Sequence, residues 1–222
     1  MNQEVAVEQG GNFIQRAFEA GGPVMYVIAL IGIFSLMLIV ERWLALNSAR
    51  INRREFNENI FGMILKGDLK QALAFCDARP APMTNTIKAG LVAVLNKRPD
   101  EEVQVAMDAA VLRETPKLEG WTPFLAVFGN IAVLAGLLGT ILGMIKSFGA
   151  VANADNATKA AELSNGIAHA LNCTAFGLMV SIICIVAYAY YQMQIQRSEN
   201  ELMESSMQML NLVAANREKI RD

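Results

Sequence analysis

The sequence predicts an all-α integral membrane protein with three transmembrane helices and long helical extensions into the cytoplasm. Hydrophobic residues make up 54% of the 222 positions and charged residues 18%, against about 25% charged residues in a typical soluble domain. The mean hydropathy of the chain is +0.32. Three long stretches also lack charged residues in their interior, as expected for helices that cross a lipid bilayer.

The amino-terminal segment, residues 1–23, is expected to lie outside the membrane core. Ile14 and Phe18 share one side of a short amphipathic helix, which suits a helix at a membrane surface. The run Gly21-Gly22-Pro23 then breaks this helix. Proline fits the first turn of a new helix, because its missing N–H would have no helical partner there.

The first transmembrane helix is expected over residues 24–46. Its apolar core ends at Glu41-Arg42, and Trp43 follows as an anchor at the membrane surface. Residues 47–120 then form a polar segment with helical periodicity and with turns such as Lys66-Gly67-Asp68. We therefore expect this segment to consist of several helices in the cytoplasm.

The second and third transmembrane helices are expected over residues 121–148 and 166–196, where apolar residues again dominate. A polar connection, residues 149–165, separates them. The tail, residues 197–222, keeps a helical pattern and is expected to continue the third helix into water.

The distribution of positive charges predicts how the chain is oriented. Of the 19 Lys and Arg residues, 12 lie in residues 42–120 and 4 in residues 197–222. Residues 1–23 contain 1, and residues 146–166 contain 2. The positive-inside rule therefore places the long polar segment and the carboxyl terminus in the cytoplasm, and the amino terminus outside.

Each of the last two spans carries a stripe of small residues that includes one threonine. Small residues three or four positions apart share a helix face and allow two helix backbones to approach closely. A threonine hydroxyl on such a face lies between helices or along a pore, or it bonds back to its own helix and only packs. The threonines are Thr140 and Thr174, and the small residues are Gly136, Gly139, Gly143, Gly166, Ala170, Gly177 and Ser181.

Ionisable residues are scarce in the three spans. His169, the one histidine of the chain, lies five residues before Thr174, and a usual pKa of about 6.5 would allow it to exchange protons. The alternative is an interfacial histidine that is hydrogen-bonded to the adjoining connection. No Asp or Glu lies inside the apolar cores. An acid for proton conduction is therefore expected on a partner, whose membrane helix the small-residue faces would receive.

The sequence contains no pattern typical of an enzyme. It has no phosphate-binding glycine loop, no Ser/His/Asp set and no metal-ligand spacing among its three cysteines. Basic residues in residues 42–120 are matched by acidic ones, so nucleic-acid binding is not expected. We therefore expect no enzyme activity and no cofactor.

Residues 21–25, 41–42, 136–145 and 166–178 together carry a family resemblance. They resemble the ExbB/TolQ/MotA family of proton-driven motor subunits, and most closely its ExbB-like branch. The two threonine motifs are specific in combination. Three spans instead of four are unlike the flagellar-stator branch.

The resemblance implies a homopentamer around a central pore that holds two single-span helices of an ExbD/TolR-like partner. In such proteins an aspartate of the partner takes up and releases protons, and threonines of the second and third spans line the pore near it. By position these are Thr140 and Thr174. The expected function is that of a stator-like subunit in the bacterial inner membrane. It would use the proton motive force, with sodium as the alternative ion, to energise TonB-dependent transport, with a TonB-like protein as a further partner.

Two departures from the family pattern affect this expectation. His169 stands where ExbB and TolQ proteins usually have a glutamate. Val133 and Ile183 stand where many members have proline, which predicts straighter helices here. The alternative functions are a TolQ-like or gliding-type motor subunit, a structural scaffold, and a passive ion channel. The lack of a charged ring in the spans argues against the passive channel.

Overall fold

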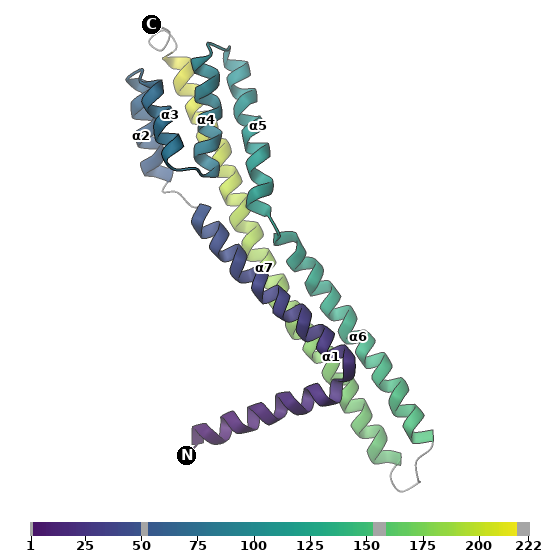
Figure 1. Cartoon of the computed structure of the whole chain (residues 1–222). Helices are drawn as coiled ribbons and strands as arrows, with labels where there is room; N and C mark the ends of the chain where they lie inside the picture. The colour runs from purple at the N-terminus through teal and green to yellow at the C-terminus, as the bar shows by residue number, and fades with distance from the viewer. Residues whose placement is uncertain (1, 50–52, 153–158, 217–222) are drawn as a thin grey trace. The chain divides into compact units, whose positions relative to one another are not determined.

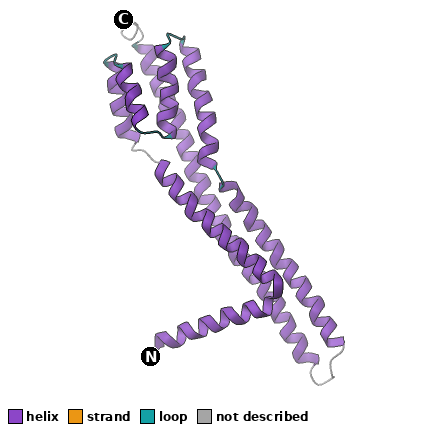
Figure 2. Ribbon diagram, viewed as in Figure 1, coloured by secondary structure: helices purple, strands orange, loops and turns teal. Residues whose placement is uncertain are grey.

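The computed structural model describes residues 2–49, 53–152 and 159–216, and every regular element within them is an α-helix (Figure 2). The all-α prediction is confirmed for this part of the chain. In chain order the helices are α1 (Asn2–Ala49), α2 (Arg53–Leu65), α3 (Leu69–Ala78), α4 (Pro82–Leu95), α5 (Asp100–Glu119), α6 (Thr122–Ala152) and α7 (Lys159–Ala215). The side chains of residues 2–21, including the predicted amphipathic face of Ile14 and Phe18, lie outside the described part.

Three helical stretches are long and apolar enough to cross a membrane, as predicted. They lie within Gly22–Ser48, Asp100–Ala152 and Lys159–Ala215. Large apolar side chains on these helices are exposed. Ile33, Leu134 and Val186, for example, have 62%, 64% and 63% of their surface exposed. A protein surrounded by water rarely exposes such a continuous apolar surface, whereas lipid tails would cover it.

Helix α1 is interrupted at Gly22, where the sequence predicted a break. Gly22 has φ 61° and ψ −161°, a backbone conformation that costs glycine little because it has no Cβ. Pro23 follows and starts the apolar part of α1, and the chain changes direction at this point (Figure 1).

Helices α6 and α7 extend further than predicted. α6 continues to Ala152 and α7 starts at Lys159, so both helices include part of the expected 149–165 connection. These extensions contain several alanines, the residue with the highest helix propensity, and no proline. α7 continues without a break to Ala215 and thereby includes residues 197–215 of the predicted helical tail. Residues 217–222 of that tail lie outside the described part of the chain.

The chain divides into two compact units. The membrane unit comprises residues 1–40 and 121–189, and the polar unit comprises residues 41–120 and 190–222. α1 and α7 contribute to both units.

The core of the polar unit forms where α4, α5 and the last part of α7 pack together. Ile87, Met107 and Met209 expose 1% of their surface or less. Gly90 on α4 leaves room for two methionine side chains, because a Cβ built there would lie 2.6 Å from the Met107 sulfur and 3.2 Å from the Met209 methyl carbon. The apolar side chains of these three helices therefore form one hydrophobic core.

Candidate functional site

Thr140 on α6 and Thr174 on α7 lie side by side in the membrane unit, and their hydroxyl groups are hydrogen-bonded to each other. The Thr140 hydroxyl also lies 3.1 Å from the carbonyl oxygen of Ala170 and 3.2 Å from that of Gly136. The Thr174 hydroxyl lies 3.2 Å from the same Gly136 oxygen. We call these two hydroxyls and two carbonyl groups the threonine cluster.

The threonine cluster contains more hydrogen-bond acceptors than protons. Each hydroxyl carries one proton, whereas both hydroxyl oxygens and both carbonyl oxygens can accept. Thr140 can donate to Thr174 while Thr174 donates to Gly136, or Thr174 can donate to Thr140 while Thr140 donates to Ala170. Both threonines are half-buried, so part of each side chain remains accessible. The cluster can therefore turn one proton toward an approaching acceptor without losing its internal bond.

Two glycines bring α6 and α7 close enough for this cluster to form. A Cβ built on Gly136 would lie 3.0 Å from the carbonyl oxygen of Cys173. A Cβ built on Gly177 would lie 2.5 Å from the carbonyl oxygen of Ala132. Backbone atoms cannot yield unless the whole helix moves, so a larger side chain at either position would separate the helices.

The other small residues that the sequence singled out also lie at the contact between α6 and α7. A Cβ on Gly139 would lie 2.8 Å from Cys173 Cβ, and a Cβ on Gly143 would lie 2.9 Å from Ala170 Cβ. Gly166 abuts Ser147, and Ser181 is buried. The two stripes thus pack against each other within one chain, although the sequence led us to expect that they receive a partner's helix. That these residues surround a pore stays a prediction.

His169 lies in α7, and its side chain is outside the described part of the structure. Its role in a proton pathway therefore stays a prediction. Among the described residues, no group of three or more His, Cys, Asp and Glu side chains could hold a metal ion.

Arg42 has a structural role that the sequence analysis missed. It was expected only as the polar end of the first span, but it is buried in the polar unit with 6% of its surface exposed. Its guanidinium is paired with the Glu41 carboxylate and donates to the backbone carbonyl of Glu119 at 3.4 Å. It also packs against Gly120, where a Cβ would lie 1.8 Å from Arg42 Nη1. No sequence spacing signals a contact between residues 77 positions apart.

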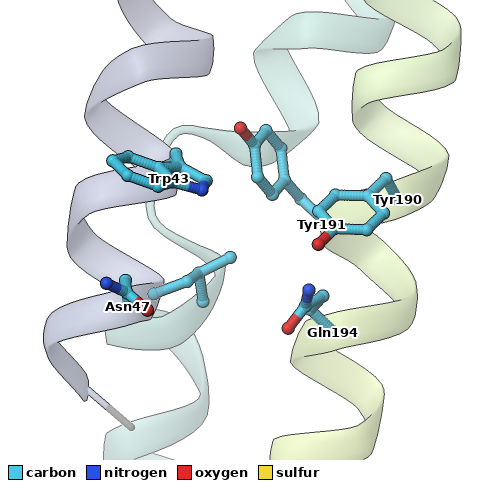
Figure 3. A pocket seen from close by; sticks show the side chains of 6 residues that line it. Trp43, Asn47, Tyr190, Tyr191 and Gln194 are labelled. Atoms are coloured by element: carbon cyan, nitrogen blue, oxygen red, sulfur yellow. The ribbon is translucent and has the colours of Figure 1, made fainter.

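A small cleft of about 30 Å³ lies in the polar unit between the end of α1 and α7. Figure 3 shows Trp43 and Asn47 from α1 opposite Tyr190, Tyr191 and Gln194 from α7. Trp43 and Tyr190 are exposed, and exposed aromatic rings of this kind are typical of the boundary between lipid and water. The cleft has room for only a few water molecules, so we do not regard it as a ligand site.

The part of the chain that contains both threonines matches a known protein family. A sequence profile of the MotA/TolQ/ExbB proton channel family matches residues 78–204, more than half of the chain. The Tol-Pal system protein TolQ of Pseudomonas aeruginosa is 32% identical over 177 residues, which are 74% of this chain and 75% of that protein. The Tol-Pal system protein TolQ of Haemophilus influenzae is 27% identical over 205 residues, 86% of this chain and 88% of that protein. The biopolymer transport protein ExbB of Pseudomonas putida is 32% identical over 114 residues, 51% of this chain and 34% of that protein.

Proposed function

The chain belongs to the MotA/TolQ/ExbB proton channel family, and on this premise we propose how it couples proton flow to work. It is a multi-pass membrane protein and a stator subunit of a proton-driven motor, not an enzyme. Family membership implies a partner of the ExbD/TolR type. In our proposal, the threonine cluster is the place where this subunit meets the proton-carrying carboxyl group of that partner.

The absence of acidic residues from the spans supports this proposal. No Asp or Glu lies in residues 24–40, 121–148 or 163–196, so the titrating acid has to come from another chain. The threonine cluster can offer that acid a hydroxyl donor, because each of its two protons has an alternative acceptor in the cluster.

The hydrogen bond from the cluster would be stronger to the ionised acid than to the protonated one. A hydroxyl that donates to a carboxylate forms a charge-assisted bond, which is about twice as strong as a bond between neutral groups. When the partner's acid takes up a proton, the hydroxyl returns to the Gly136 or Ala170 carbonyl. The partner's helix is then released from this position and free to move to the next one.

We further propose an arrangement of subunits consistent with this mechanism. Copies of the chain, five by resemblance to the family, surround a pore that holds two helices of the partner. The chain lies in the bacterial inner membrane with its amino terminus in the periplasm and its polar unit in the cytoplasm. The excess of Lys and Arg in residues 42–120 and 197–222 supports this orientation.

Two envelope systems are candidates for the machine that the motor energises. The Gly21-Gly22-Pro23 entry to the first span favours an ExbB-type role in TonB-dependent transport. The identity to the TolQ protein of Pseudomonas aeruginosa, 32%, is slightly higher than the 29% identity to the ExbB homolog of Methanothermobacter thermautotrophicus, which covers a similar share of this chain, and this difference favours a Tol-type role.

Complementation distinguishes these roles. The chain is expressed with its own single-span partner in bacteria that lack both ExbB and TolQ, and TonB-dependent uptake and outer-membrane integrity are measured. Recovery of uptake supports the ExbB-type role, and recovery of membrane integrity supports the Tol-type role. In either case a protonophore should abolish the recovery. Ion conductance by the purified chain alone in liposomes, without recovery of either process, would overturn the proposal in favour of a passive channel.

A further inference from the structure

The membrane unit contains a cavity whose lining includes neither Thr140 nor Thr174. It has a volume of about 440 Å³ and lies between the start of the α1 span and the adjoining ends of α6 and α7. Its lining includes the apolar residues Val24, Leu142 and Ala170. Pockets of this size with mainly apolar walls and a few polar groups are typical of small-molecule sites.

Glycines make up part of the lining of this cavity. Gly22, Gly139, Gly143 and Gly166 all line it, one or more from each of the three helices. At Gly22 the break in α1 ends the apolar span at the edge of the cavity. A Cβ built on Gly22 would meet no atom within 4 Å, so the cavity is open on this side.

The polar groups of the cavity favour an anion. Lys146 is the one charged residue among the described residues that line it, and it forms no ion pair with any residue that the structure describes. The Ser147 hydroxyl donates to the Gly143 carbonyl at 2.8 Å and is therefore already bonded. Asn165 adds an amide at the rim. No carboxylate is among the lining residues that the structure describes, so none of these residues would repel a negatively charged group.

The position of Lys146 along α6 indicates a lipid. Lys146 is the one charged residue of α6, and it lies six residues after Thr140, about 9 Å along the helix axis. A lysine at the end of an apolar span lies at the level of the lipid headgroups, where its ammonium meets phosphate oxygens. The apolar walls next to it lie at the level of the acyl chains.

We propose that this cavity binds one anionic phospholipid. The phosphate group of the lipid lies at the Lys146 ammonium, and part of one acyl chain lies against Val24, Leu142 and Ala170. The lipid thereby fills the space between the three helices at this end of the membrane unit. This inference depends only on the membrane unit and not on the motor mechanism.

The test measures lipid binding to the full chain, purified in a neutral detergent, by native mass spectrometry. Phosphatidylglycerol should bind in preference to phosphatidylcholine. Lys146→Gln should weaken binding of phosphatidylglycerol about fivefold, the usual effect of one basic residue near an anionic headgroup. It should leave phosphatidylcholine binding unchanged. Ala150→Trp, which fills the cavity from an exposed lining position, should weaken binding of both lipids.

Lys159→Gln is the matched control, because Lys159 lies at the start of α7 and does not line the cavity. If Lys146→Gln and Lys159→Gln weakened phosphatidylglycerol binding equally, the lipid would be attracted to the positive charge of the protein in general. That result would overturn the proposal. So would displacement of the lipid by an equal concentration of inorganic phosphate, since the site would then recognise a free anion. Loss of the lipid when the single-span partner is added would show that the partner's helix occupies the cavity instead.

Discussion

Thr140 and Thr174 are 34 positions apart in the chain, yet their hydroxyl groups are hydrogen-bonded to each other between α6 and α7. Both hydroxyls also reach the carbonyl oxygen of Gly136. The two threonines therefore act as one hydrogen-bonding unit, and replacing either one changes the partners of the other.

Replacing either threonine by valine should reduce function much more than stability. Valine keeps the branched shape of threonine, and the remaining hydroxyl can still donate to the Gly136 carbonyl. We expect Thr140→Val and Thr174→Val each to cost about 0.6–1.7 kcal/mol of unfolding free energy. Loss of a hydrogen bond to a charged acid should lower proton-driven activity about tenfold or more. Proton flux and complementation, measured alongside thermal unfolding, would separate the two effects.

Ser35→Ala is the matched control for the threonine variants. Ser35 is buried in the membrane unit, and its hydroxyl donates to the Ile31 carbonyl of its own helix at 2.8 Å. Its loss should leave proton-driven activity intact. If both valine variants retained full activity, the threonine cluster would have no part in proton transfer.

Gly177→Ala should destabilise the membrane unit. The new methyl group would lie 2.5 Å from the Ala132 carbonyl oxygen, so α6 and α7 must separate, at a cost of about 1–3 kcal/mol. Gly149→Ala in α6 is the control, because nothing lies within 4 Å of a Cβ at Gly149 and alanine favours helix. Thermal unfolding in detergent should show a lower midpoint for Gly177→Ala alone. Equal midpoints would mean that the close helix contact does not hold in the folded protein.

Gly120→Ala should destabilise the polar unit through Arg42. Gly120 has φ 45°, which strains an alanine, and a Cβ there would overlap the Arg42 guanidinium. Arg42→Ala removes that overlap, so Gly120→Ala should cost less in the Arg42→Ala background. A double-mutant cycle of unfolding free energies measures this difference. Gly62→Ala, in α2 with nothing within 4 Å, should have little effect. Additive losses in the cycle would rule out the contact between Gly120 and Arg42.

Cys76 should make the stability of the polar unit depend on pH in alkaline solution. Burial, helped by the neighbouring Asp77 carboxylate and opposed by Lys88, raises the pKa of this thiol from 9.0 to about 11. Below pH 9 the thiol is protonated in both the folded and the unfolded chain. As the pH rises from 9 to 11, the unfolded chain loses the proton first, so the folded state loses stability. We expect a loss of about 1–2 kcal/mol over this range.

The Cys76→Ala variant isolates this effect from the titration of other groups. The unfolding free energy of the wild-type chain should fall with pH more steeply than that of the variant, and only above pH 9, the ordinary value for the thiol. Parallel curves would mean that the thiol is not buried in solution.

His169→Glu should preserve activity, and His169→Leu should reduce it. The family resemblance implies a glutamate at this position, and both histidine and glutamate can exchange protons. Leucine keeps the bulk but cannot titrate. Proton-driven activity of the two variants at equal expression is the measurement. Full activity in both would leave His169 with a packing role only.

Much of the candidate site could be predicted from the sequence. Thr140, Thr174 and the glycines near them were identified by their three- and four-residue spacing, which reports the face of a helix. The spacing could not show that Gly136 and Gly177 face each other in one chain, because it describes each helix separately. Arg42 was misjudged for the same reason, since its carbonyl partner, Glu119, lies 77 positions away.

The three apolar helices, the break at Gly22 and the uneven placement of charge could all be read from the order of the residues alone. These properties depend on neighbouring residues, on hydropathy over a span and on the backbone freedom of glycine. Which helix faces meet became known from the folded chain. It paired the two threonine stripes, buried Arg42 and left a cavity beside Lys146. Such contacts depend on how whole helices align and fill space, which no local pattern of residues specifies.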